Sequence, residues 1–314
     1  MELSVLLLGQ ILVMMVMVLV GVVMAKCRLV NGEESRIISR VVVYVITPCT
    51  LLDAFQTELD RNKLEGLLAS FLAAVLIYAA FLGVTWLLSR GPHPLTPGEQ
   101  VCVVYSNSGN LIIPIILNTL GSEFVIYSCA YLVVQNLMTW THGQMLLGGS
   151  QKLTVKQVVT NPCMCGIFLG LAMFFLRVQL PNVLGSAVSA LGACLGPISM
   201  LVIGVMLAEA DLKQAFSSLA IYRVIALRLI VYPLLAGAIL WGVASVWWGR
   251  GDVTGALTVM LLCAIGPSAT TLTQMAQMYR NPESGYMSSI NAVTTVLCSI
   301  TMPVMIFLFQ LLPK

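Results

Sequence analysis

Charged side chains are scarce in this chain. They make up 9% of its 314 residues, and only two residues are histidine, whereas a soluble domain carries about 25% charge. A core of this size cannot hide the deficit, because 59% of the residues are hydrophobic and the mean hydropathy is +0.95. We therefore expect most of the surface to face lipid. The net charge is a modest +3 without a basic tract, so nucleic acid is not an expected partner.

The sequence also lacks enzyme and metal motifs. It has no paired membrane aspartates, no H-E-x-x-H and no nucleophile elbow, so we do not expect an intramembrane enzyme. Most of the nine cysteines lie in apolar runs, where free thiols pack as small hydrophobic groups. Cys163 and Cys165 form only a C-x-C motif, without a second pair or a nearby histidine. We therefore expect no metal site and no cofactor.

What the chain does have is a series of long apolar stretches. The first, from Leu3 to Ala25, follows Glu2 rather than a basic segment, so it is expected to be a retained span and not a cleaved signal. The pattern predicts an all-α membrane protein with ten transmembrane helices. Their expected ranges are 3–25, 37–57, 66–89, 99–119, 123–147, 157–177, 183–208, 218–248, 253–277 and 285–311.

Two halves of the chain show weak self-similarity. Matching pairs are Pro48 with Pro197, Pro114 with Pro267, Tyr131 with Tyr286, and Asn136 with Asn291, at offsets that drift from 149 to 155. A repeat of five helices is odd-numbered, so the second copy must enter the membrane upside down. We expect residues 1–150 to form the first five-helix repeat and residues 151–314 to form the second, inverted one.

Lysine and arginine predict the orientation, because they are enriched in cytoplasmic loops. One side would hold Lys26, Arg28, Arg36, Arg40, Arg90, Lys152, Lys156, Lys213 and Arg280, and the other Arg61, Lys63, Arg177, Arg250 and Lys314. The first set is the larger one, so we predict that both termini lie outside.

Polar residues interrupt two of the predicted spans at matched places. Residues 102–119 read CVVYSNSGNLIIPIILNT, with Asn107, Ser108, Gly109 and Asn110 at mid-span and Pro114 behind them. Residues 261–276 read LLCAIGPSATTLTQMA and contain Gly266, Pro267 and Ser268. Unpaired backbone groups cost several kcal/mol in hydrocarbon, so such breaks survive only where protein or a cavity surrounds them. Matched breaks are a pointer to a transporter substrate site.

A broken helix offers free amides at the start of its second half, and these form a ready anion site. Glycine and serine at the breaks, namely Gly109, Gly266 and Ser268, would let the two backbones approach closely. The alternative is a kink whose polar groups only re-satisfy the broken backbone. Asn136 and Asn291, with Gln135, are mid-span polar groups that either contact substrate or bond between helices.

Ionisable groups at depth are few. Arg228 is either a cation that attracts anions or a residue that snorkels to the interface and anchors its helix. Asp53, near the end of the second span, is either a helix-end carboxylate in the headgroup region or a proton or cation site. His142 is expected to be an interfacial polar residue rather than a proton relay.

Several segments resemble the auxin efflux carrier family, which includes plant PIN-type carriers and bacterial organic-acid permeases. They are SNSGNLIIPI, SRVVVYVITPCTLL, GPISMLVIGVMLAEADL and PSATTLTQMAQMYRNPE with SSINAVTTVLCSITMP. The chain lacks the long central loop of the larger plant members and is similar to a compact, bacterial type. The resemblance implies ten helices in two inverted five-helix repeats. It also implies that the broken fourth and ninth helices cross at the centre and bind a carboxylate there.

We therefore expect a secondary transporter of a small organic anion that works by alternating access in the cell (inner) membrane. The expected partners are a small carboxylate and the lipid bilayer, with a homodimer as a candidate assembly. Proton and sodium are the candidate coupling ions, and facilitated diffusion is the uncoupled alternative. A receptor or sensor that binds such a ligand without moving it is the alternative function.

Overall fold

The computed structural model describes residues 2–58, 60–148, 159–209, 219–246 and 253–310. The expected boundary between the halves at residues 150 and 151 lies outside this part of the chain. So do Lys152, Lys156, Lys213, Arg250 and Lys314, which entered the prediction of orientation.

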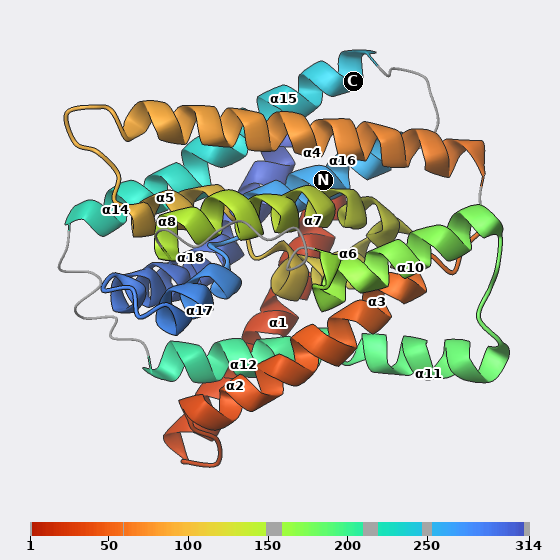
Figure 1. Cartoon of the computed structure of the whole chain (residues 1–314), viewed down its shortest axis with the longest axis horizontal. Coiled ribbons are helices and arrows are strands. Elements are labelled where there is room, and N and C mark those ends of the chain that lie inside the picture. The colour runs from red at the N-terminus through yellow and green to blue at the C-terminus, as the bar shows by residue number, and fades with distance from the viewer. Residues whose placement is uncertain (1, 59, 149–158, 210–218, 247–252, 311–314) are drawn as a thin grey trace.

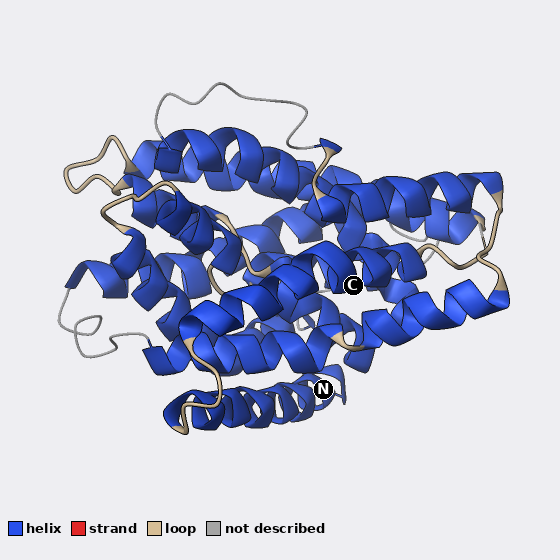
Figure 2. Cartoon of the chain, turned by 60° about the horizontal axis from the view of Figure 1, so that its bottom comes forward, coloured by secondary structure: helices blue, strands red, loops and turns tan. Residues whose placement is uncertain are grey.

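The described residues are helical, apart from short connections and one isolated bridge between two residues (Figures 1 and 2). In the first half the helices are α1 (Glu2–Lys26), α2 (Gly32–Val41), α3 (Thr47–Ala54), α4 (Arg61–Leu88), α5 (Pro97–Val104), α6 (Ile113–Thr119), α7 (Val125–Met138) and α8 (Gln144–Gly148). In the second half they are α10 (Pro162–Leu176), α11 (Asn182–Ala193), α12 (Leu195–Glu209), α14 (Leu219–Ala226), α15 (Tyr232–Val246), α16 (Val253–Ile265), α17 (Thr270–Met278) and α18 (Ser284–Gln310). Each of the ten expected ranges holds one or more of these elements.

Length and composition separate these helices into two sets. Within the described residues, six are long and apolar enough to cross a membrane: Leu8–Lys26, Gly32–Ala54, Arg61–Leu88, Asn182–Glu209, Ala220–Val246 and Ser284–Phe309. Ser108–Thr119, Pro162–Leu176 and Val253–Ile265 are apolar but shorter. The fourth and ninth expected spans fall outside the long set because their breaks divide them. The ten-span layout therefore stays a prediction at this point.

Wide helical turns precede three of the prolines. The π-helical segments η1 (Val42–Ile46), η2 (Ser108–Ile112) and η5 (Leu227–Val231) stand just before Pro48, Pro114 and Pro233. A proline ring clashes with the carbonyl four residues earlier, and in all three cases that carbonyl lies within the π-helical segment. We attribute these wide turns to the prolines. A fourth π-helical segment, η4 (Thr139–Gly143), has no such proline.

The helices pack as two groups. The first contains α1, α2, α3, α10, α11 and α12, and α1 packs along α12 while α3 packs against α10 and α11. The second contains α4, α5, α6, α7, α14, α15, α16, α17 and α18, with α16 against α4 and α15. In Figure 1 most of the second group lies in the upper part, and α2, α3, α11 and α12 lie in the lower part. The groups touch where α1 meets α6 and α18, where α12 meets η2 and α6, and where α3 and α10 meet α7.

Glycines hold the first group together at close range. A Cβ on Gly204 would lie 2.1 Å from Val18 O, and one on Gly21 would lie 2.3 Å from Leu201 O. A Cβ on Gly166 would meet Pro48 O at 2.9 Å. No side chain fits at these distances, so glycine is required for the contacts of α1 with α12 and of α10 with α3.

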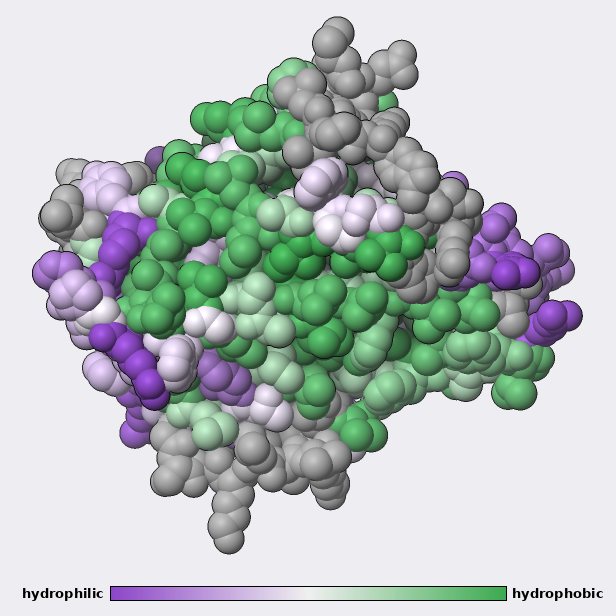
Figure 3. Space-filling view, turned by 90° about the horizontal axis from the view of Figure 1, so that it is seen from above, coloured by the Kyte–Doolittle hydropathy of each residue, from purple (hydrophilic) through white to green (hydrophobic). Residues whose placement is uncertain are grey.

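The surface is that of a protein in a bilayer. Hydrophobic residues form a broad band between hydrophilic residues at the two ends of the long axis (Figure 3). Large apolar side chains are widely exposed on the helices, for example Leu12 at 57%, Leu68 at 54% and Ile300 at 67%. The scarcity of charge thus has the structural outcome that the sequence predicts.

Candidate functional site

The two broken segments meet inside the molecule. α5 ends at Val104 and α16 ends at Ile265, and a short non-helical stretch follows each of them. These stretches run antiparallel and form a bridge between Ser106 and Ser268, both of which are fully buried. Residues 162 positions apart in the chain therefore lie side by side at the crossing.

Backbone hydrogen bonds hold the crossing on both sides of this bridge. The Asn107 N–H donates to Pro267 O over 2.8 Å, and the Ala269 N–H donates to Tyr105 O over 3.0 Å. Buried backbone groups need partners, and here each break supplies them to the other. The breaks are therefore one paired structure rather than two separate kinks.

A side-chain amide from each half completes the bridge. Gln135 Nε2 donates to Ser106 O over 2.9 Å, and Asn291 Nδ2 donates to Ser268 O over 2.7 Å. The two amides therefore do the same work in the two halves. Asn136, which the sequence pairs with Asn291, instead donates to a carbonyl of its own helix over 3.0 Å. Gln135 is the structural counterpart of Asn291, so the sequence pairing was wrong by one residue.

Gln135 is also a junction for hydroxyl groups. Its Oε1 accepts from Ser108 Oγ over 2.6 Å and from Tyr78 Oη over 3.0 Å. Ser106 Oγ donates to the same oxygen over 3.3 Å. On the other side of the crossing, Ser268 Oγ donates to the Cys102 carbonyl of α5 over 2.7 Å. This network fixes the shape of both breaks.

Arg228 lies at the crossing and is fully buried. Its Nε and Nη2 donate to Gly266 O over 2.9 and 2.6 Å, its Nη2 also donates to Ala264 O over 2.8 Å, and its Nη1 donates to Val103 O over 3.1 Å. The carbonyls at a helix C-terminus have no partner within the helix. One guanidinium thus satisfies the ends of α5 and α16 together.

The snorkelling alternative for Arg228 is therefore wrong. Its helix begins at Leu219 within the described residues, so Arg228 stands roughly two and a half turns inside the helix. It lies in η5, the wide turn before Pro233. Four hydrogen bonds to carbonyls hold the side chain there, and it does not extend to the membrane interface.

The crossing combines this cation with four helix ends. The ends of α5 and α16 each carry roughly half a negative charge, and the starts of η2 and α17 each carry roughly half a positive charge. Arg228 offsets the two negative ends, so about one positive charge remains. Among the described residues, the ion pairs are Arg61 with Glu65 and Arg223 with Glu99, so no carboxylate neutralises Arg228.

The two positive helix ends lie next to each other. Asn110 Nδ2 donates to Thr270 Oγ1 over 3.5 Å. The first turn of η2 therefore lies against the first turn of α17. The N-cap residues are Asn107 and Ala269, and neither supplies a side-chain cap. The first amides of both helices are therefore available to an anion.

Two small cavities flank Thr270. One, of about 20 Å³, is lined by the polar residues Ser39, Asn110, Ser199, Thr270 and Gln274 and by apolar side chains of η1 and α12. The other, of about 10 Å³, lies between Thr270 and residues of α12 and α18, Asn291 among them. A cavity of this size holds about one water molecule. In this structure the crossing therefore leaves little free space beside its polar groups.

Within the described ranges, three buried polar atoms at this place have no hydrogen-bond partner. They are Ser199 Oγ and Thr295 Oγ1, which belong to residues lining the two cavities, and Asn107 Nδ2 at the break. The residues are at most 4% exposed. An unpaired buried polar group costs about 1–3 kcal/mol, so these atoms are suited to form hydrogen bonds with a ligand or an ordered water molecule.

The glycines of the breaks differ from each other. A Cβ on Gly266 would lie 3.1 Å from Ile112 Cδ1 and Cγ1, so Gly266 is in the close contact that the sequence predicts. A Cβ on Gly109 would have no atom within 4 Å, and Gly109 does not have positive φ. The prediction that Gly109 permits close approach of the two backbones is therefore wrong. It leaves open space beside Ser108 and Asn110.

Two other predicted site residues lie apart from the crossing cavities. Pro114 is in the first turn of α6, and its ring faces Gly196 of α12, where a Cβ would lie 3.3 Å from the Pro114 Cβ. Asp53 is near the end of α3 and lines an open cleft of about 630 Å³ with Gln56, Ser189 and other residues of α11. The structure brings neither side chain into the polar network described above.

Sequence reasoning named Gln135 among the mid-span polar groups that contact substrate or bond between helices, but it missed Ser106 and Tyr78. A mid-span glutamine is a usable signal, because an amide in hydrocarbon needs partners. The role of Arg228 also had a signal in Pro233, five residues on. Proline implies a local widening of the helix, and π-helical turns are frequent at functional sites.

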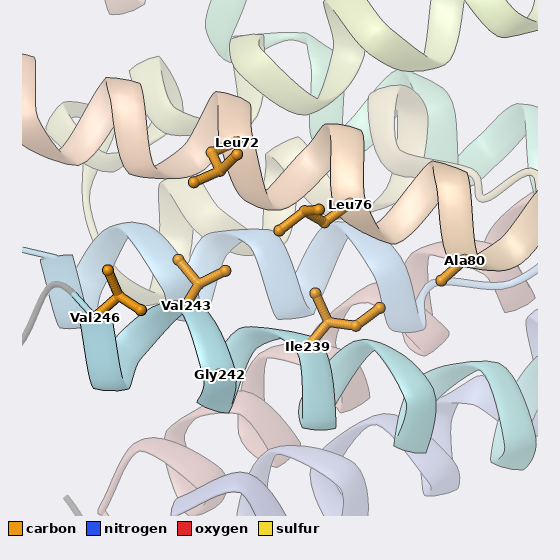
Figure 4. Close-up of a pocket in the computed structure, with 7 residues that line it drawn as sticks. All are labelled: Leu72, Leu76, Ala80, Ile239, Gly242, Val243 and Val246. Atoms are coloured by element: carbon orange, nitrogen blue, oxygen red, sulfur yellow. The ribbon is translucent and has the colours of Figure 1, made fainter.

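A fourth cavity is chemically unlike the crossing. It is a groove of about 450 Å³ between α4 and α15, and the seven residues that line it are apolar: Leu72, Leu76, Ala80, Ile239, Gly242, Val243 and Val246 (Figure 4). It offers no polar side chain to an anion. In a bilayer such a groove would face acyl chains.

Comparison with models of known protein families gives a match. A family model described as membrane transport protein matches residues 6–158 and 150–306, which together span nearly the whole chain. No curated protein matches it.

Proposed function

The chain belongs to the membrane transport protein family of auxin efflux carriers, and from that premise we propose that it is a secondary transporter of a small organic anion. Members of this family are transporters rather than enzymes, and the chain is a multi-pass membrane protein. The substrate class, the site and the mechanism are the proposed part.

One observation carries the choice of an anion. Arg228 occupies the carbonyl ends of both first half-helices and leaves the amide ends of both second half-helices uncapped. The remaining charge of about +1 faces a region without a carboxylate partner. A small carboxylate would offset this charge and accept hydrogen bonds from the free amides. Asn107, Asn110 and Ser199 would add uncharged donors around it.

The arrangement also supports an inverted repeat of two five-helix units. An antiparallel bridge between Ser106 and Ser268 is what a two-fold axis in the membrane plane would produce, and Gln135 and Asn291 repeat one contact across it. Inverted repeats with broken helices at the midplane are common among secondary transporters. On this layout the chain has ten spans with both termini outside the cell membrane.

Alternating access would use the two helix groups. The first group packs internally through glycine contacts that allow little adjustment, so it would move as one rigid body. Rigid rocking of one group against the other would expose the crossing to each side in turn. The cavities beside Thr270 are small, so the crossing would have to widen to admit a carboxylate.

Uptake into proteoliposomes tests this proposal. Labelled mono- and dicarboxylates of two to six carbons would be offered in turn. Matched sugars would serve as neutral controls and matched amines as cationic controls. We expect saturable uptake of at least one carboxylate, and loss of it in the Asn110→Ala variant. Binding of a carboxylate without uptake would favour a receptor instead. Saturable uptake of an amine alone would contradict the anion assignment.

A further inference from the structure

The cavity among Asn110, Ser199 and Thr270 is also lined by two polar side chains from different helix groups. Ser39 of α2 and Gln274 of α17 are both lining residues. α2 belongs to the first group and α17 to the second, so this part of the cavity lies on the seam between the groups. Movement of one group against the other would open the cavity here first.

A hydrogen bond crosses the seam one helical turn further out. Arg36 Nη2 donates to Gln277 Oε1 over 3.5 Å. Arg36 precedes Ser39 by three residues on α2, and Gln277 follows Gln274 by three residues on α17. Residues three apart share a helix face, so the pair of Arg36 and Gln277 lies directly outside the pair of Ser39 and Gln274.

Both members of the outer pair are exposed, whereas Ser199 inside the cavity is buried. The bond is long and joins a charged group to a neutral amide at the surface, so it is weak and readily exchanged. A carboxylate would make shorter, charge-assisted bonds to the same guanidinium, and two of them in parallel. An arriving carboxylate would therefore displace Gln277.

Acidic residues near the start of α2 do not occupy Arg36. Glu34 accepts from the Asn31 N–H over 2.9 Å in a capping box, and Glu33 makes no ion pair with Arg36 within the described residues. Within the described part of the chain, Arg36 is thus a cation without an ion-pair partner, next to a cavity whose inner end carries positive charge.

We propose that Arg36 and Gln277 form the mouth of the substrate path at this end, and that Arg36 selects for anions by binding the carboxylate first. This inference rests on the proposed transport of an organic anion. It adds a residue that determines charge specificity outside the crossing, on the helix group opposite to the amide ends.

The test measures the reaction of a thiol inside the cavity with charged reagents. The full chain would carry Ser199→Cys, with the exposed Cys27 and Cys165 replaced by serine, and the same background without Ser199→Cys gives the blank. Rates would be compared in proteoliposomes for an anionic and a cationic methanethiosulfonate of similar size. Gln274→Cys serves as a second reporter if Ser199→Cys does not fold.

We expect the anionic reagent to react faster with the reporter. Arg36→Gln should remove this preference and raise the cationic rate about threefold, as expected for a weak surface contact. Gln277→Ala should raise both rates and keep the preference. Lys26→Gln removes another exposed cation at the end of α1 and should change nothing.

An unchanged preference in Arg36→Gln, or an equal effect of Lys26→Gln, would overturn the assignment. So would a cavity thiol that reacts with neither reagent, because the cavity would then not open at this end. The labelling needs no transported substrate. Absence of carboxylate uptake together with an intact, Arg36-dependent preference would refute transport and leave the mouth in place.

Discussion

Removal of the charge at Arg228 is the most direct perturbation of the crossing. The guanidinium of Arg228 donates to three backbone carbonyls. In Arg228→Gln a neutral amide with only two donor hydrogens takes its place. At least one buried carbonyl would lose its partner, at roughly 1–3 kcal/mol. Part of this cost is offset because a buried charge no longer has to be desolvated.

The effect on binding can be estimated separately. A unit charge at about 8 Å from a carboxylate contributes roughly 2 kcal/mol at an effective dielectric constant of about 20. The Kd of a transported carboxylate should therefore rise about thirtyfold in Arg228→Gln. Arg228→Lys keeps the charge but cannot bridge both half-helices with a planar fork. We expect it to lose stability while its Kd stays within a few-fold of the unmodified protein.

The assay is equilibrium binding of the carboxylate that uptake identifies, with thermal unfolding of the same purified variants. Because Arg228 is fully buried, the difference in Kd should persist between low and high salt, since buried charges are poorly screened. A folded Arg228→Gln variant with unchanged Kd would refute the electrostatic reasoning. Equal losses in Arg228→Lys and Arg228→Gln would show that the fork matters and the charge does not.

Three further predictions concern the breaks. Gly109→Ala should fold and transport normally because its Cβ meets open space, whereas Gly266→Ala should reduce stability through contact with Ile112. Thermal unfolding and uptake are measured for both variants, and equal stability of the two would contradict this prediction. Asn110→Ala should abolish or strongly weaken substrate binding with little change in folding, because its amide faces the cavity; normal affinity would remove it from the site. Gln135→Ala should cost about 1–3 kcal/mol of stability, since it leaves the buried Ser106 carbonyl unpaired. Asn136→Ala should cost less than about 1 kcal/mol. The reverse order of these two costs in unfolding experiments would restore the pairing of Asn136 with Asn291 that the sequence suggested.

The sequence predicted where the crossing would be, although not how it is built. Asn107, Ser108 and Ser268 mark breaks because polar residues at mid-span have no other stable place in hydrocarbon. It paired Asn136 with Asn291 because alignment of two weakly similar halves compares residue types. Gln135 fills the corresponding place because helix rotation, and not residue type, decides which side chain faces Ser106.

Arg228 shows the same division more sharply. The sequence left two alternatives open for Arg228, because its own helix reports only how far the residue lies from the membrane interface. The carbonyls of Val103, Ala264 and Gly266 come from two other segments of the chain. No local pattern around Arg228 reports their presence, so its role could not be read from its own helix.

By itself the sequence determined that this protein lies in a lipid bilayer and is helical. It also determined the family and the positions of the two breaks. Composition and apolar length report how each segment meets lipid, and that is a local property. Only the tertiary structure decided which groups satisfy the broken backbones, which helix ends stay free and which glycines are in contact. These depend on what other parts of the chain place within about 3 Å, because an unpaired buried polar group takes whichever partner packing brings to it.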